Sequence, residues 1–294
     1  MFDCHVHAAP DIVDRLGDDR DILQTYERAG ASGFVLKGHH ESTVGRAHSL
    51  ARQTGLAVVG GVTLNHTVGG VNPAAVAAAL QAGGRVVWMP TTDAHAQEQA
   101  SLPRLCDTEV RLGRAVLGVP PAEPQAQAAA DLVLALIADH DAVLATGHLS
   151  GAECHWLLGR ARHFGINRLL LTHPSYTVPG LDPAAVAELA AAAGFVEITA
   201  YQLLHQPGCT PAMLAQVARA AGPRLVLSSD AGQPNSPPPP EPCSSSSTNS
   251  PGKKSTAACY EPLPPPSPPT CSSRDITPDL CPVPRSRAQD TATR

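Results

Sequence analysis

Residues 56–90, LAVVGGVTLNHTVGGVNPAAVAAALQAGGRVVWMP, contain one full period of the pattern on which the fold prediction depends. Apolar runs predict strands over 56–64 and 85–90. Between them, Asn72-Pro73 predicts the start of a helix, because asparagine caps a helix N-terminus and proline fits its first turn. A strand, a helix and a strand in this order are typical of a βαβ unit with parallel strands.

The same alternation recurs along most of the chain. Strands are expected at 1–7, 33–38, 56–64, 85–90, 142–147, 168–172, 195–200 and 224–229. Helices are expected at 21–29, at 43–53, from 72 onward, and at 125–140, 151–164, 182–193 and 210–222. The pattern predicts an α/β protein, a (β/α)₈ TIM barrel, for which about 250 residues are typical and which a chain of 294 residues can hold.

The composition changes abruptly near residue 234. More than half of the 29 prolines lie beyond this point, with the runs Pro-Pro-Pro-Pro at 237–240 and Ser-Ser-Ser-Ser at 244–247. Such a segment cannot bury enough apolar surface to offset its ordering entropy. We therefore expect a barrel domain over 1–233 and a disordered Pro/Ser-rich tail over 234–294.

The eighth helix of the barrel should follow Asp230 and is expected to be missing. Because the alternation stops so suddenly, we hypothesise that the tail is a shifted reading frame or a wrongly assigned end of the coding region, and not an evolved segment. Translation of the coding DNA in its other two frames tests this idea, which fails if neither frame encodes an amphipathic helix.

The bulk composition narrows the partners and the compartment. The net charge is -5 and 43% of the residues are hydrophobic, so no basic face for nucleic acid or for an anionic membrane is expected. No apolar run is long enough to span a bilayer, and the N-terminus lacks the pattern of a signal peptide. These features favour a cytoplasmic protein that acts on a small molecule.

Residue types that bind metals recur at the predicted strand ends, where the chemistry of a barrel gathers. They are His5, His7, Lys37, His148, His173 and Asp230. Taken singly, each has a structural explanation: a lone histidine is often a core or loop residue, and an aspartate can cap a helix. Their joint placement, one strand end after another, favours a metal site.

The spacing of His5 and His7 has a physical meaning. Residues i and i+2 of a strand point to the same face, so the two imidazoles can converge on one ion. Imidazole and carboxylate together suit Zn²⁺ and similar divalent ions. Asp3 is expected on the same face, where it could orient a histidine, whereas Phe2, Cys4 and Val6 should face outward.

With these residues in place, 1–233 resembles the amidohydrolase superfamily of metal-dependent hydrolases. The resemblance rests on Asp3-Cys4-His5-Val6-His7, on His148, His173 and Asp230 after strands five, six and eight, and on two phrases similar to a poorly characterised amidohydrolase-like group, Val35-Leu36-Lys37-Gly38-His39 and Asn72-Pro73-Ala74-Ala75-Val76. It implies that a metal-activated water attacks an amide, lactone or ester bond.

The resemblance also implies roles for single residues. His5 and His7 would bind the metal, and His148 and His173 would supply a further ligand and a second ligand or water-orienting group. Asp230 would bind the metal weakly and take the proton from the attacking water.

One departure concerns the number of ions. Two-metal members place a bridging lysine or glutamate on strand four, and residues 85–90 contain neither. A single ion, Zn²⁺, is therefore expected. Lys37 could be a substitute bridge or a cation that binds substrate, or it could simply reach solvent.

Other functions remain open. A non-oxidative decarboxylase of the same superfamily would use the same ligands, and CO₂ release would identify it. A PHP-type phosphoesterase also opens with His-x-His, but the eight predicted strands argue against its seven-stranded barrel. The chain could instead be an inactive truncated barrel, because Leu225 and Leu227 would face outward without an eighth helix over them. A homo-oligomer could cover the groove that the missing helix leaves.

Overall fold

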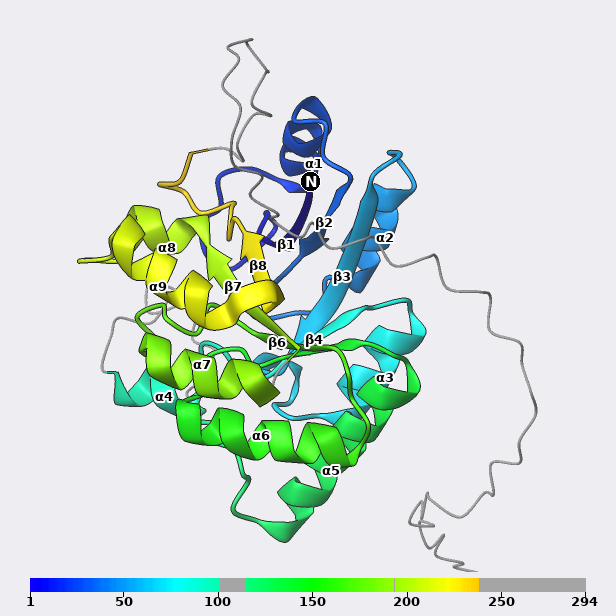
Figure 1. The fold of residues 1–294 in the computed structure, drawn as a ribbon. Helices are drawn as coiled ribbons and strands as arrows, with labels where there is room; N and C mark the ends of the chain where they lie inside the picture. The colour runs from blue at the N-terminus through cyan, green and yellow to red at the C-terminus, as the bar shows by residue number, and fades with distance from the viewer. Residues whose placement is uncertain (101–114, 193, 238–294) are drawn as a thin grey trace, which may run out of the picture. The chain divides into compact units, whose positions relative to one another are not determined.

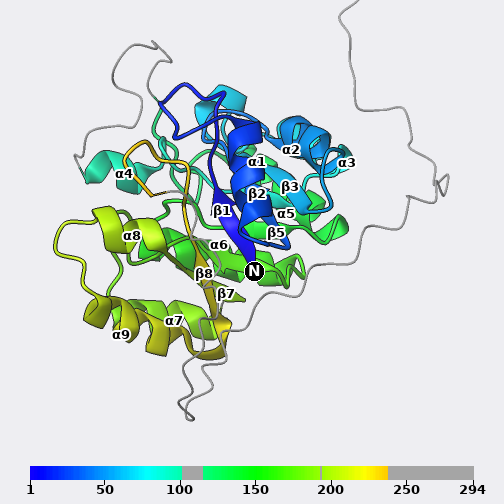
Figure 2. The same ribbon diagram turned by 90° about the horizontal axis from the view of Figure 1, so that it is seen from above.

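The computed structural model describes residues 1–100, 115–192 and 194–237. Within them, eight parallel strands pair in sequence order from β1 to β8, and β8 returns to β1 through a bridge between Ala231 and Val6. The strands lie at the centre, with helices such as α1, α2, α7 and α9 outside them (Figures 1 and 2). The predicted (β/α)₈ barrel is confirmed.

The elements have the following bounds. The strands are β1 (Phe2–Val6), β2 (Gly33–Leu36), β3 (Ala57–Thr63), β4 (Val86–Trp88), β5 (Val143–Ala145), β6 (Leu169–Leu171), β7 (Phe195–Thr199) and β8 (Leu225–Ser228). The α-helices are α1 (Asp19–Arg28), α2 (Val44–Ala51), α3 (Pro73–Gln81), α4 (His95–Gln99), α5 (Pro124–Asp139), α6 (Gly151–His163), α7 (Pro183–Ala192), α8 (Ala200–His205) and α9 (Pro211–Ala221). Two short 3₁₀ helices are η1 (His66–Val68) and η2 (Gly222–Arg224).

The predicted helix starts before proline are confirmed by their capping bonds. The side chain of Asn72 accepts a hydrogen bond from the backbone N–H of Ala74, and Thr210 accepts from Met213. Asp182 accepts from the N–H of Ala185 in the same way. Each bond satisfies a donor that the first helical turn leaves free, which is why these residue types mark the boundaries so well.

Two helices were not predicted, α4 and α8. Both are short, so neither gives a clear helical periodicity in the sequence. α8 begins at Ala200, which was assigned to the end of a strand, because Thr199 turns the chain by accepting from the N–H of Gln202. α4 lies in the long connection between β4 and α5, and residues 101–114 of that connection lie outside the described residues.

The barrel interior is packed by small and branched side chains around Trp88. Its buried members are Val35, Val86, Trp88, Ala145 and Leu170, and side chains from the other strands pack against them. Two further clusters lie between the strands and the surrounding helices. Below its mouth the barrel is therefore a filled core, as expected of this architecture.

The register of β1 corrects one sequence prediction. Asp3 pairs with Phe34 and Val6 with Leu36, so β1 has one more residue than β2 over this stretch. Such a bulge reverses the alternation of side chains. Phe2 and Cys4 consequently pack inside the barrel, not outside as predicted, whereas Val6 faces the outer cluster as expected.

Asp3 is therefore not beside the histidines. Its carboxylate lies outside the barrel, where Oδ2 accepts from the Tyr26 hydroxyl at 2.6 Å. Oδ1 accepts from the backbone N–H of Ser229 at 3.1 Å and from that of His5 at 3.2 Å. The predicted contact of Asp3 with a histidine ring is wrong, because the bulge turns Asp3 towards α1. It joins β1 to the end of β8 instead.

The outer face of β8 agrees only in part with the expected lack of cover, because Leu225 packs against the cluster between strands and helices. Leu227 is 59% exposed, while Val226 packs inside the barrel. After β8, the structure describes residues 229–237, and these contain no helix. The predicted tail lies outside the described residues from 238 onward, so its disorder and the reading-frame hypothesis remain predictions. None of the described helices has the length and apolar character needed to cross a membrane.

We predict that Asp3→Ala lowers the free energy of unfolding by about 3 kcal/mol, because it leaves buried donors unpaired at roughly 1–3 kcal/mol each. Urea denaturation measures the change. Asp14→Ala is the control, because Asp14 is exposed on the neighbouring loop, and it should change stability by less than about 0.5 kcal/mol. Equal stabilities of the two variants would contradict the role of Asp3 in joining β1 to the end of β8.

Candidate metal centre

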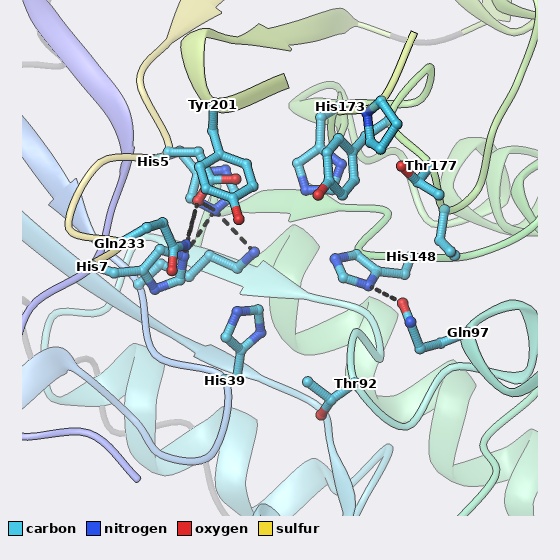
Figure 3. A pocket seen from close by; sticks show the side chains of 15 residues that line it. His5, His7, His39, Thr92, Gln97, His148, His173, Thr177, Tyr201 and Gln233 are labelled. Atoms are coloured by element: carbon cyan, nitrogen blue, oxygen red, sulfur yellow. Dashed lines mark hydrogen bonds and ion pairs between the residues drawn. The ribbon is translucent and has the colours of Figure 1, made fainter. Parts of the chain in front are cut away.

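Among the described residues, five histidines line one cavity of about 320 Å³ at the carboxyl ends of the strands (Figure 3). All six site residues expected from the sequence line it: His5, His7, Lys37, His148, His173 and Asp230. The two helices that the sequence did not reveal also contribute, Gln97 from α4 and Tyr201 from α8. The barrel thus gathers residues far apart in the chain at one mouth.

Three of these side chains come close enough to share one ion. His5 Nε2 lies 3.2 Å from His7 Nε2 and 3.4 Å from Asp230 Oδ1, and His7 Nε2 lies 3.3 Å from the same oxygen. All three residues are buried. His148 and His173 line the cavity but do not belong to this close group.

Local backbone structure holds the three side chains together. The bulge in β1 turns both His5 and His7 into the cavity. His7 N–H donates to the carbonyl of Ala231 at 2.8 Å, which places Asp230 beside β1. Gly232 has a φ of +96°, and a Cβ there would lie 1.9 Å from the carbonyl oxygen of His7. Only glycine allows the chain to pass so closely.

Glu197 on β7 was missed by the sequence analysis. It is 1% exposed, and its Oε1 lies 3.2 Å from His5 Nδ1. It also accepts from the Ser228 hydroxyl at 2.6 Å and from the backbone N–H of His173 at 3.1 Å. A glutamate within the apolar run 195–199 is the signal that could have identified it, because a buried carboxylate needs such partners.

Glu197 fixes the tautomer of His5. The carboxylate accepts a hydrogen bond from the Nδ1–H of the imidazole, so Nε2 keeps its lone pair and faces His7 and Asp230. Burial opposes the ionised form of Glu197, but the His5 imidazole and its hydrogen bonds keep the pKa of Glu197 below its usual value. The same contact orients the ring.

The protonation states of the other groups suit a divalent cation. Burial lowers the pKa of His7 well below its usual value and that of His173 to about 4, so both imidazoles are neutral near pH 7. Burial opposes ionisation of Asp230, but the neighbouring His5 and His7 hold its pKa well below the usual range. Neutral imidazoles and an ionised carboxylate are the forms that bind metals.

Lys37 is a basic residue in contact with this group. Its Nζ lies 3.1 Å from His5 Nε2 and 5.7 Å from the centre of the Trp88 ring. Burial lowers the pKa of Lys37 to about 8. The donor set itself, two imidazole nitrogens and one carboxylate oxygen, fits Zn²⁺.

His148 and His173 lie further along the cavity wall. The ring of His173 stacks on that of His5 with centroids 5.6 Å apart, and His148 lies 5.2 Å from His173. His148 Nδ1 lies 3.1 Å from Gln97 Oε1. Their roles as further ligands or water-orienting groups, which the resemblance implies, remain predictions.

Comparisons with known proteins agree with this architecture. A family model described as "Family of unknown function (DUF6282)" matches residues 1–197. No curated protein matches the chain in sequence.

Solved structures match the fold at low sequence identity. An amidohydrolase from Pseudomonas aeruginosa is 11% identical, with a TM-score of 0.53 over 80% of this chain and 75% of that one. An organophosphorus hydrolase from Deinococcus radiodurans is 13% identical, with a TM-score of 0.48 over 80% and 78%. At such identities the first comparison shows a shared barrel fold.

We predict that Lys37→Met increases Zn²⁺ affinity about tenfold or more, because a like charge near the ion costs several kcal/mol at an effective dielectric constant of about 20. Competition with a chromogenic chelator measures the affinity. Arg52→Met removes an exposed charge from the surface and serves as the control. A loss of affinity in Lys37→Met would instead support Lys37 as a bridging ligand.

We also predict that Glu197→Gln lowers Zn²⁺ affinity by about 10- to 100-fold, the usual effect of removing a carboxylate that orients a ligand histidine. The same chelator competition applies. Glu188→Gln is the matched control, because the side chain of Glu188 is 71% exposed on α7. Unchanged affinity in Glu197→Gln would rule out this positioning role.

Proposed function

The chain belongs to the family of unknown function DUF6282, and from the residues of its cavity we propose that it is a metal-dependent hydrolase of small molecules. The proposal follows the resemblance to the amidohydrolase superfamily and is supported by the shared barrel fold. The bond cleaved is proposed to be an amide, a lactone or an ester.

One observation carries this proposal. His5 Nε2, His7 Nε2 and Asp230 Oδ1 lie within 3.2 to 3.4 Å of one another in a buried cavity. Two imidazole nitrogens and a carboxylate oxygen this close together are the kind of donor set that binds Zn²⁺ in proteins. The shared fold alone would not support an activity, because one barrel hosts many chemistries.

The residues divide the work of hydrolysis. His5, His7 and Asp230 would hold a divalent ion, Zn²⁺ in this proposal, which when bound lowers the pKa of water and polarises the scissile carbonyl. Asp230 takes the proton that the attacking water loses and delivers it to the leaving group. Glu197 keeps His5 oriented through Nδ1. His173 stacks on His5 and lines the same cavity, where it could orient the attacking water.

A single ion is proposed. β4 contributes Val86, Val87 and Trp88, none of which can bridge two ions. Lys37 lines the cavity, and its Nζ contacts His5. The volume of about 320 Å³ lies at the lower end of small-molecule sites, which are typically about 300–1,000 Å³. The substrate is therefore proposed to be a compact molecule.

The metal content of purified His7→Ala tests the site. We expect wild-type protein to hold about one equivalent of zinc by elemental analysis and His7→Ala to lose most of it, because two ligands rarely retain the ion. His48→Ala is the control, since His48 is exposed on α2. Zinc retained by His7→Ala would refute the metal site.

Activity is tested on the same proteins with a panel of esters, lactones and amides. Zinc-loaded wild-type protein should hydrolyse at least one class, a chelator should abolish this, and added Zn²⁺ should restore it. Activity that survives both the chelator and His7→Ala would contradict the proposed mechanism.

A further inference from the structure

His39 is a buried histidine of the cavity that is not part of the close metal-binding group. It follows β2, two residues after Lys37, and is 4% exposed. Its ring stacks on that of His7 with centroids 5.0 Å apart and lies 6.3 Å from His148. In Figure 3 it points from the cavity wall into the space between these two histidines. Its task can be inferred from the hydrogen bonds behind it.

The chain of bonds behind His39 begins at Asn65. Asn65 Oδ1 accepts from the backbone N–H of Thr91 at 2.9 Å and from that of Asp93 at 3.2 Å. Backbone N–H groups can only donate, so they fix which end of the Asn65 amide is oxygen. Its Nδ2 group therefore donates to the carbonyl of His39 at 2.7 Å and to Thr91 Oγ1 at 2.8 Å.

Because Thr91 accepts from Asn65, its own hydroxyl proton is left to donate to the imidazole of His39. Its hydroxyl oxygen already accepts from Asn65, and Thr91 is fully buried. A buried hydroxyl proton needs an acceptor. Among the described residues, the acceptor within reach is His39 Nδ1, 2.9 Å away. His39 Nδ1 therefore carries the lone pair, and Nε2 carries the proton.

This assignment sets His39 apart from His5. The Nδ1–H of His5 donates to the carboxylate of Glu197, which leaves the Nε2 lone pair of His5 free to bind a cation. Thr91 does the opposite at His39, where Nε2 is a hydrogen-bond donor facing the cavity. A neutral imidazole with a proton on Nε2 cannot bind a metal through that nitrogen. The cavity thus has a side that binds cations and a side that donates hydrogen bonds.

We propose that His39 is a substrate-binding residue, whose Nε2–H donates to a negatively charged oxygen of the substrate, in a carboxylate or phosphoryl group. Lys37, two residues earlier, lines the same cavity and adds positive charge to it. An N–H donor and an ammonium group together favour an oxyanion over a neutral group. The inference rests on the proposed function and specifies its substrate class as anionic.

The tautomer of His39 is the first test. Long-range ¹H–¹⁵N NMR of protein labelled at histidine distinguishes a proton on Nδ1 from one on Nε2, and the signal missing in His39→Gln assigns the residue. We expect the Nε2–H form in metal-free protein and no change when Zn²⁺ is added. An Nδ1–H form, or loss of the Nε2 proton on adding Zn²⁺, would overturn the proposal.

Thr91→Val is a second variant, which removes only the hydroxyl behind the ring and leaves His39 in place. It should mix the two tautomers of His39. An unchanged tautomer in a folded Thr91→Val protein would show that Thr91 does not set the donor.

Anion binding is the second test, by titration of zinc-loaded protein with inorganic phosphate and with acetate at constant ionic strength. The ¹⁵N shift of His39 should respond to at least one anion, and the tighter anion distinguishes a phosphoryl from a carboxylate group. His39→Leu should weaken binding at least tenfold, whereas His39→Gln, which keeps an N–H donor, should stay within threefold of wild type. His48→Leu is the surface control and should bind as wild type.

Wild-type affinity in His39→Leu, or no response of His39 to either anion, would overturn the proposal. These outcomes differ from a failure of the metal centre, which the zinc content of His7→Ala reports. The tautomer of His39 can be measured whether or not the protein holds zinc.

Discussion

The extra residue in β1 is the constraint on which the cavity depends. It lets Phe2 and Cys4 fill the barrel interior and still turns His5 and His7 into the mouth a few residues later. The same shift sends Asp3 outward, where its carboxylate accepts from Ser229 and Tyr26. One bulge thus positions the histidines and supplies the bonds that close the barrel from β8 to β1.

This closure matters because Asp230 follows the strand with the least outer cover among those described. Leu227 is largely exposed, so packing on the outer face of β8 contributes little to holding it. Polar contacts do so instead: the Asp3 carboxylate holds Ser229, and the backbone pair between His7 and Ala231 holds the turn after Asp230. The carboxylate of the candidate metal centre is therefore positioned from β1 more than from a helix behind it.

The hydrogen-bond partners of the cavity histidines differ from one another. Histidines that look alike in the sequence have different partners at Nδ1: a carboxylate for His5, a threonine hydroxyl for His39 and the Gln97 amide for His148. A partner that accepts the Nδ1 proton leaves Nε2 free to bind a cation, and a partner that donates makes Nε2 a donor. The groups behind the rings decide which part of the cavity can bind a metal and which can bind an anion.

The sequence by itself determined the barrel, most element positions and six residues of the cavity, because the apolar periodicity and the helix caps are local signals and strand ends meet at one mouth. It could not reveal the bulge, since strict alternation in 1–7 placed Asp3 with His5. It also missed Glu197 and left His39 without a role. Only the tertiary structure decided these points, because register and the hydrogen-bond partner of a buried side chain depend on residues that are distant in the chain.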